Sequence, residues 1–319
     1  MIAEPSDPPD MRLIPGGTFT MGSEHFYPEE RPLRRVKLDS FWIDETPVTN
    51  RQFAKFVAAT GHVTEAEISP DPRNYPGMLP EYAQPGSLVF MKTAGPVPLD
   101  EFHCWWHFTL GASWRHPLGP DSDLDGLDLW DHPVVHIAWA DASAYARWAG
   151  KDLPTEAEHE YAARGGLVDM DYAWGDELAP GGQMLANFWQ GLFPFSNTRD
   201  DGWERTSPMR TYPANGYGLF DMIGNVWEWT KDWWSDRPHI PAKQRGNSCC
   251  TISNPRGARL NDSFDPGMPG VRIGRKVLKG GSHLCAVNYC QRFRPAARHP
   301  EMVDTATSHI GFRCVKRNK

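Results

Sequence analysis

Two cysteines five residues apart, Cys285 and Cys290, are the residues whose type and spacing most plainly indicate chemistry. They follow a Gly-Gly step and Ser282, and Arg292 and Arg294 come soon after them. The spacing fits neither a zinc-ribbon nor a thioredoxin motif. In an extended strand the two Cα atoms would lie roughly 16 Å apart, at ~3.3 Å per residue, so the backbone must bend if both sulfurs are to meet one partner. Spacing alone favours an ordinary disulfide or two buried thiols over a reactive pair.

The other cysteines form no recognisable disulfide framework, because Cys104, Cys249, Cys250 and Cys314 are scattered and two of them are adjacent. The sequence begins without the basic and apolar regions of a signal peptide. No run approaches the ~20 apolar residues of a membrane span. We therefore expect a cytoplasmic protein that is not bound to a membrane and whose thiols are mostly reduced. The sequence assigns no role to these four cysteines.

Composition indicates a loop-rich protein that is held together by aromatic side chains. The 319 residues are 40% hydrophobic and 23% charged, which is enough for a sizeable core. Glycine and proline each number 29 and tryptophan 14, which favours loops over a helical bundle. The net charge of −7 argues against nucleic acid as a partner. No linker divides the chain, so we predict a flexible tail over 1–10 and one α+β domain over 11–319.

Local signals place a few regular elements among these loops. Thr49 and Gln52 make a capping box, as do Thr155 and Glu158, and each box opens a predicted helix. We expect helices over 50–60, 141–148 and 155–164, a hairpin over 11–21, and strands over 35–43 and 134–139. The histidines are dispersed, and no P-loop, dinucleotide fingerprint or nucleophile elbow is present, so zinc, iron, nucleotide and serine-hydrolase chemistry are not indicated.

Two segments rich in oxygen ligands are candidates for a hard cation. Asn187 and Asp201 bracket the first, and the second runs from Asp221 to Glu228 with a glycine between them. Calcium takes six to eight oxygens, many of them backbone carbonyls, which suits a loop-rich fold. Neither segment is an EF-hand, and spacing alone favours solvated turns.

Four stretches resemble the formylglycine-generating enzyme family, the sulfatase-modifying oxidases: 14–22, 148–166, 215–229 and the closing 311–314. The resemblance covers about 11–316 in the expected order. It implies a single domain related to C-type lectins, with little regular secondary structure. Active members of the family carry two cysteines five apart after Gly-Gly-Ser, and Ser282, Cys285 and Cys290 match that pattern.

The resemblance implies an oxidase that uses Cu(I) and molecular oxygen. Cys285 and Cys290 would hold the copper as thiolates, since soft thiolates select Cu(I) and two ligands would leave zinc two short of four. The substrate would be the cysteine of a Cys-x-Pro-x-Arg segment in an unfolded sulfatase. Oxidation at its Cβ and hydrolysis of the thioaldehyde would give Cα-formylglycine. Ser282, Trp227 and Tyr289 would line or order the site.

The resemblance also implies two structural calcium sites, whose ligands combine side chains with backbone carbonyls. The first would use Asn187, Phe188, Asp201 and Trp203, and the second Asp221, Gly224, Val226 and Glu228. His159 stands where the family usually has tryptophan, which should alter helix packing and not chemistry. Ala163 and Pro295 replace cysteines that form disulfides in animal members.

Some alternatives remain open. The chain could be a catalytically silent lectin-like module with a Cys285–Cys290 disulfide, or another metal-dependent oxidase on the same fold. Arg292 and Arg294 could lower the thiol pKa values or serve as surface charges or backbone clamps. The protein is expected to be a monomer.

Overall fold

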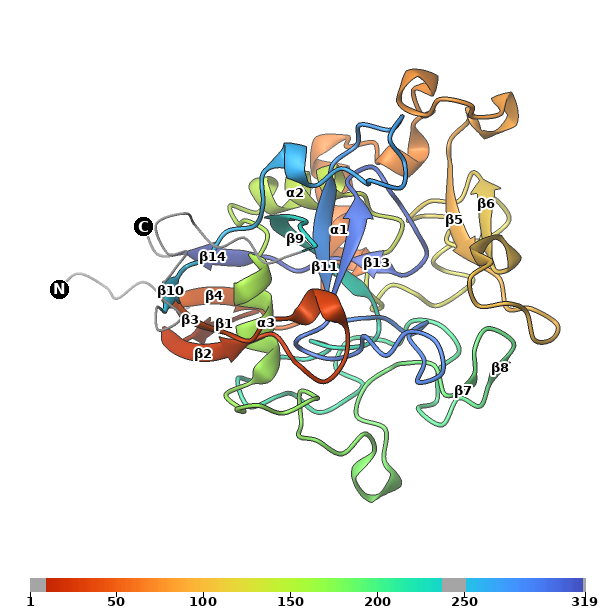
Figure 1. The fold of residues 1–319 in the computed structure, drawn as a ribbon. Coiled ribbons are helices and arrows are strands. Elements are labelled where there is room, and N and C mark those ends of the chain that lie inside the picture. Colours follow the sequence, from red (N-terminus) through yellow and green to blue (C-terminus); the bar gives the residue numbers. More distant parts are fainter. Residues whose placement is uncertain (1–9, 237–250, 318–319) are drawn as a thin grey trace.

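The structure, a computed structural model, describes residues 10–236 and 251–317. Within these ranges, short strands and three α-helices are joined by long loops (Figure 1). The helices are α1 (Asn50–Thr60), α2 (Trp139–Trp148) and α3 (Glu156–Arg164). The strands are β1 (Met11–Ile14), β2 (Gly17–Met21), β3 (Arg34–Leu38), β4 (Phe41–Asp44), β5 (Gly86–Phe90), β6 (Trp106–Leu110), β7 (Gly191–Leu192), β8 (Ser196–Asn197), β9 (Trp227–Trp233), β10 (Ile252–Ser253), β11 (Arg275–Lys279), β12 (Arg298–Met302), β13 (Ile310–Gly311) and β14 (Val315–Arg317). The expected loop-rich α+β class is confirmed.

Helices α1 and α3 begin at the capping boxes that the sequence predicts. At the start of α1, the Thr49 backbone N–H donates to Gln52 Oε1 at 2.9 Å, and the Gln52 N–H donates to Thr49 Oγ1 at 3.2 Å. The helix ends at Gly61 in the left-handed region, with φ at 67°. Helix α2 begins earlier than predicted, because the Asp141 carboxylate caps it from within by accepting the Ala138 N–H at 3.0 Å.

Strand pairing corrects three of the expected elements. The hairpin predicted over 11–21 is wrong, because β1 pairs with β4 and β2 pairs with β3. The strand predicted over 35–43 is broken into β3 and β4. The segment 134–139 is no strand, since His136 takes a positive φ of 60° and α2 begins at Trp139. The apolar residues of this segment are explained by its position as a buried connection between elements.

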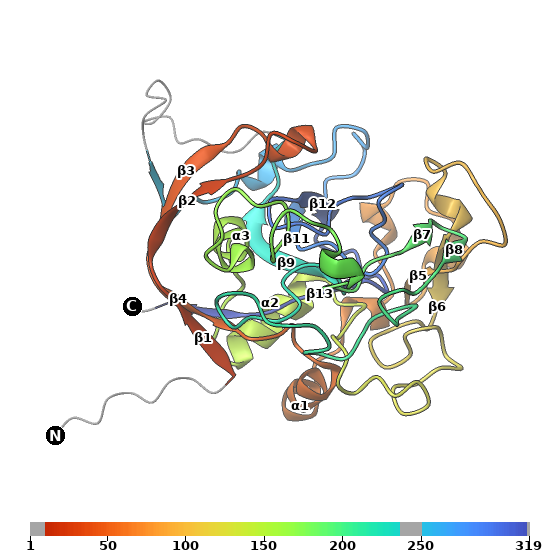
Figure 2. The ribbon, with the colours of Figure 1, turned by 90° about the horizontal axis from the view of Figure 1, so that it is seen from below.

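A four-stranded sheet in the order β12-β11-β9-β13 occupies the centre of the molecule (Figure 1). On one side lie α3 and two three-stranded sheets, β1-β4-β14 and β10-β3-β2. The hairpins β5-β6 and β7-β8 lie on the other side (Figure 2). Strands β11 and β12 are antiparallel neighbours, and the loop 280–297 that joins them carries both cysteines. None of the helices in the described ranges has the length and apolar character needed to cross a bilayer.

Helix α3 anchors both ends of this loop through two buried carboxylates one helical turn apart. Glu160 accepts from Lys279 Nζ at 3.1 Å, at the end of β11. Glu156 accepts from Arg298 Nη2 at 3.1 Å, at the start of β12. Because buried charges are strongly destabilising without partners, these pairs tie the two strand ends to one rigid element.

Two clusters of buried side chains meet at the loop. The larger hydrophobic cluster includes Phe53, Trp229 and Phe312 together with Cys285. A smaller aromatic cluster, defined here by Phe90, Trp105, Trp189 and Phe193, packs against Tyr289. Since Tyr289 precedes Cys290, the two cysteines lie where these clusters adjoin.

Candidate functional site

The Gly-Gly step before Ser282 is required by a close backbone approach. Gly280 and Gly281 have φ values of 90° and 74°. A Cβ atom on Gly281 would lie 2.6 Å from the carbonyl oxygen of Arg292. Only glycine fits this conformation and this contact without strain. The step therefore brings the start of the site loop against the segment that follows Cys290.

Two hydrogen-bonded turns make the bend that the cysteine spacing requires. The Cys285 N–H donates to the Ser282 carbonyl at 2.9 Å, and the Cys290 N–H donates to the Ala286 carbonyl at 2.9 Å. The two Sγ atoms consequently face each other at 3.4 Å. This exceeds the ~2.05 Å of a disulfide bond, and both residues are free thiols.

The two thiols have unequal environments and opposite pKa shifts. Burial raises the pKa of Cys285 well above its usual value, and the neighbouring Cys290 raises it further. The pKa of Cys290 falls to about 7, first because the Cys285 thiol donates a hydrogen bond to it and also because the Arg292 guanidinium is close. Cys290 is therefore the member of the pair that ionises near neutral pH.

The two arginines after the pair have different roles. Arg292 Nη1 lies 3.7 Å from Cys290 Sγ, while its Nη2 binds Glu29 Oε1 at 2.7 Å. Its guanidinium also lies over the Tyr27 ring, 3.7 Å from the centroid. Arg294 instead pairs with the buried Glu30, with Nη1 3.0 Å from Oε2. Only Arg292 faces a site sulfur, and Arg294 clamps the loop to the N-terminal segment.

Ser282 and Tyr289 lie beside the pair, whereas Trp227 only shares a hydrophobic cluster with Cys285. Ser282 is fully buried, and its backbone N–H points at Cys285 Sγ at 3.4 Å while its hydroxyl accepts the Leu284 N–H. Tyr289 stacks on Phe193 with ring centroids 4.4 Å apart. Trp227 begins β9, stacks on His299 at 5.6 Å, and belongs to the hydrophobic cluster that includes Cys285.

Sequence reasoning missed the N-terminal contribution to the site. Tyr27 accepts the Gln291 N–H at 2.9 Å through its hydroxyl, and Glu29 and Glu30 pair with the site arginines. These residues lie more than 260 positions before their partners, so no spacing rule connects them. The available signal was chemical, because arginines that follow buried cysteines need carboxylate partners.

The first predicted calcium segment brings some of its proposed ligands together. Asp201 accepts the Trp203 N–H at 2.9 Å and the Phe188 N–H at 3.1 Å. The Gln190 amide nitrogen lies 3.0 Å from Asp201 Oδ2 and also contacts the Phe188 carbonyl. Burial raises the pKa of Asp201. This half-buried carboxylate suits a cation, and Gln190 is an additional ligand candidate because its amide also carries an oxygen. Asn187 donates to the Arg205 carbonyl at 2.8 Å.

The second segment is less suited to a cation, because one of its two carboxylates already has partners. Left-handed φ values at Asp221 and Gly224 shape the turn before Val226, and burial raises the pKa of Asp221 to about 6. Glu228, however, is bound at both oxygens by Arg313, at 2.7 and 2.9 Å. His159, expected to affect only packing, also reaches Glu228 Oε2 at 3.2 Å. Asp221 is thus the available carboxylate, and Glu228 already has partners.

The other two described cysteines have different surroundings from this pair. Cys314 is fully buried, its N–H donates to Asp44 Oδ2 at 2.9 Å, and burial raises the pKa of its thiol. Such a thiol is inert. Cys104 lies beside Glu101 and His103, and Cys249 and Cys250 lie outside the described residues.

These features define a loop-rich α+β domain that presents two facing, unequal thiols. A family model described as sulfatase-modifying factor enzyme 1-like domain matches residues 2–318. The formylglycine-generating enzyme of Mycobacterium tuberculosis is 53% identical over 95% of this chain and 96% of that protein. The mouse inactive C-alpha-formylglycine-generating enzyme 2 is 34% identical over 96% of this chain and 85% of that protein. The structure of PvdO from Pseudomonas aeruginosa, 21% identical, matches with a TM-score of 0.58 over 97% of this chain and 94% of that one, which supports the fold.

The chain therefore belongs to the sulfatase-modifying factor family, as the sequence motifs predicted. The expected boundary between a tail over 1–10 and a domain from 11 stays a prediction, because residues 1–9 lie outside the described ranges.

Proposed function

We propose that this protein converts the cysteine of a Cys-x-Pro-x-Arg segment in an unfolded sulfatase to Cα-formylglycine, using molecular oxygen and Cu(I). The observation that carries the proposal is the pair of facing thiols, Cys285 and Cys290, with sulfurs 3.4 Å apart. The name and 53% identity of the mycobacterial relative support the reaction.

The donor set suits Cu(I) better than the other common ions. Two cysteine sulfurs are soft ligands, which hard cations disfavour. Ser282 and Leu284, which precede Cys285 in the chain, are buried. Zinc would need two more protein ligands. Bound at Cys285 and Cys290, copper would supply the reactivity toward oxygen that side chains lack.

The residues of the chain prepare this site in three ways. Cys290 supplies a thiolate near neutral pH, because its pKa is about 7. Cys285 must lose its proton when the metal binds, and the Ser282 N–H at 3.4 Å supports the resulting charge on its sulfur. Arg292 offsets the added negative charge beside Cys290. Burial of Cys285 limits access of water to the pair.

We further propose that calcium occupies both oxygen-rich segments as a structural ion. Asp201 with Phe188 and Gln190 would hold the first ion, and Asp221 would be the main carboxylate for the second. The support is geometric: Phe188 and Gln190 lie at the Asp201 carboxylate, and left-handed φ values at Asp221 and Gly224 shape the second turn. In this proposal the protein works as a cytoplasmic monomer.

A peptide assay tests the reaction directly. Metal-free protein is loaded with Cu(I) and incubated in air with a Cys-x-Pro-x-Arg peptide, and the product is read by mass spectrometry. We expect the mass change of cysteine-to-aldehyde conversion, no change with Cys290→Ala, and retained turnover with Cys314→Ala as the matched buried-thiol control. An unchanged peptide mass, or turnover by Cys290→Ala, would refute the thiol-pair mechanism.

A silent binding module is the second candidate, favoured by the inactive mouse relative. Anaerobic titration with Cu(I) separates it from the oxidase. An oxidase should bind one equivalent tightly, and Cys290→Ala should lose that binding. A module without tight Cu(I) binding, together with an unmodified peptide, would establish the second candidate. Copper binding without peptide conversion would instead indicate another metal-dependent oxidase.

A further inference from the structure

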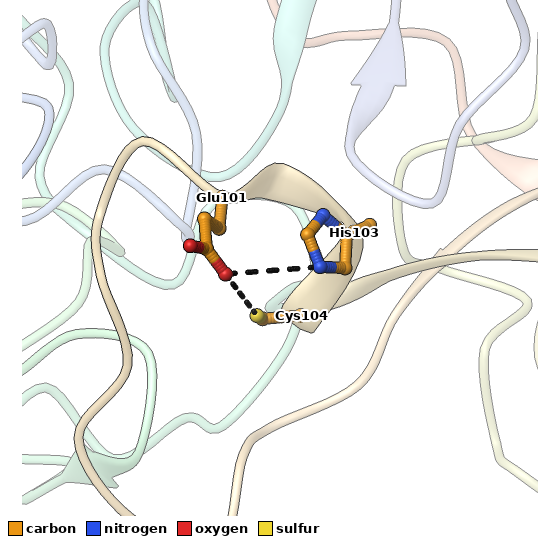
Figure 3. Close-up of side chains that lie close together, drawn as sticks. All are labelled: Glu101, His103 and Cys104. Carbon is orange, nitrogen blue, oxygen red and sulfur yellow. Dashed lines mark hydrogen bonds and ion pairs between the residues drawn. The ribbon is translucent and has the colours of Figure 1, made fainter.

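A second group of metal-binding side chains lies on a different loop, between β5 and β6. His103 and Cys104 belong to the short 3-10 helix Phe102–Cys104, and Glu101 directly precedes it. The three side chains point toward one another (Figure 3). Glu101 Oε2 lies 3.8 Å from His103 Nε2 and 3.8 Å from Cys104 Sγ. The three ligand atoms all lie within 4.8 Å of one another.

These separations are close to those of a tetrahedral zinc site. Bonds of ~2.1 Å to oxygen and nitrogen and ~2.3 Å to sulfur, at tetrahedral angles, separate ligand atoms by about 3.4–3.6 Å. The two distances measured from Glu101 exceed this range by a few tenths of an ångström. Small rotations of exposed side chains are enough to close that difference.

The backbone of this group is held firmly although its side chains are accessible. The next residue, Trp105, is fully buried and contacts the rings of Phe193 and Tyr289 edge-on, at 5.4 and 5.7 Å. The Cys104 N–H donates to the Glu101 carbonyl at 3.0 Å, which closes the turn. By contrast, the His103 side chain is 80% exposed and that of Glu101 is 51% exposed. An ion could therefore enter without disturbing the core.

Charge at the group also suits a cation. The Glu101 carboxylate oxygen Oε2 lies 3.8 Å from both His103 Nε2 and Cys104 Sγ and places a negative charge beside them. Coordination of a divalent ion would release the proton of the Cys104 thiol.

We propose that Glu101, His103 and Cys104 form a site for a zinc-class divalent ion, with a fourth position open to water or to an incoming ligand. One sulfur, one imidazole nitrogen and one carboxylate oxygen are all established zinc ligands. Calcium and magnesium are disfavoured by the thiol and the imidazole, and Cu(I) by the carboxylate. This site is separate from Cys285 and Cys290, and it does not depend on the oxidase proposal.

Cobalt(II) is the probe that tests this site, because a thiolate bound to cobalt gives a charge-transfer absorption that oxygen-only sites lack. The titration uses metal-free, reduced protein carrying Cys285→Ser and Cys290→Ser, which removes the other thiol pair. We expect one equivalent of cobalt to produce the band and zinc to displace it. Adding Cys104→Ser should abolish the band, and adding His103→Ala should weaken affinity by at least roughly tenfold.

Glu101→Gln provides a milder variant, which should weaken binding while keeping the band at high cobalt concentration. Circular dichroism would verify that each variant is folded. Two results would overturn the proposal: no thiolate–cobalt band in the double variant, or a band that persists after Cys104→Ser. The second result would assign the signal to another thiol.

Discussion

Removing the positive charge of Arg292 should raise the pKa of Cys290. The guanidinium Nη1 lies 3.7 Å from Cys290 Sγ. At this separation and an effective dielectric constant of ~20, one unit of charge stabilises a thiolate by about 4.5 kcal/mol. Glu29 binds the same guanidinium at 2.7 Å and offsets roughly half of that effect. About 2 kcal/mol remains, which corresponds to about 1.5 pKa units.

The direction of the pKa change depends on whether the charge stabilises the thiol or the thiolate of Cys290. Arg292 favours the thiolate, so Arg292→Met should raise the pKa of Cys290 from about 7 to ~8.5, the value of a free cysteine. At pH 7 the thiolate fraction would fall from about one half to about 3%. A thiolate with a higher pKa is also more nucleophilic, by about fivefold for this shift. The alkylation rate at pH 7 should therefore fall only about threefold.

The midpoint of the rate–pH profile is accordingly a better measurement than one rate. Metal-free protein is treated with iodoacetamide at a series of pH values, quenched and digested, and the Cys290 peptide is quantified by mass spectrometry. Arg292→Lys, which keeps the charge, is the matched variant and should shift the midpoint much less. The Cys104 peptide in the same digests is an internal control. A Cys290 midpoint that stays near 7 in Arg292→Met would refute the electrostatic explanation.

Three further predictions concern stability. Glu160→Gln removes the carboxylate that binds the buried Lys279 Nζ and should lower the free energy of unfolding by about 3–5 kcal/mol. Glu204→Gln, in an exposed pair, should cost less than about 1 kcal/mol. Equal losses in urea denaturation would contradict this. The pKa of buried His136 is lowered to about 4, so the unfolded chain takes up a proton on this histidine first as pH falls below ~6.5. By pH 4 the free energy of unfolding of wild type should therefore fall by up to about 3 kcal/mol more than that of His136→Gln. Parallel curves of stability against pH would exclude this cause. A calcium chelator should lower the melting temperature of wild type more than that of Asp201→Asn, and identical shifts would argue against calcium at Asp201.

Short-range features of this fold were predictable from sequence because their causes are local. Thr49 and Thr155 each begin a helix through a hydrogen bond to a residue three positions ahead. The Gly-Gly step before Ser282 is also a local feature, since both glycines have positive φ values. The bend between the cysteines followed from geometry once both sulfurs were assigned to one site through the family resemblance.

Long-range pairing was not predictable in the same way. The residues 11–21 have the pattern of a hairpin, yet β1 and β2 enter different sheets because β3 and β4 supply their partners. The segment from Val134 to Ala138 resembles a strand in sequence because all of its residues are buried. Burial alone does not distinguish a strand from a packed connection. At the site, the partners of Arg292 and Arg294 come from Tyr27 to Glu30, which no local pattern connects to residue 290.

Long-range packing contributes to the inequality of the two thiols, beside the hydrogen bond between them. Cys285 and Cys290 are the same residue type on the same loop, and both are buried enough for desolvation to oppose ionisation. Cys290 also has a cation beside its sulfur, because Arg292 Nη1 lies 3.7 Å from its Sγ and is held by Glu29 and the Tyr27 ring from the N-terminal segment. The N-terminal segment is thus part of the site through Arg292. A chain with the same cysteine motif but without Glu29 and Tyr27 would lose the positioning of Arg292, which helps to lower the pKa of Cys290.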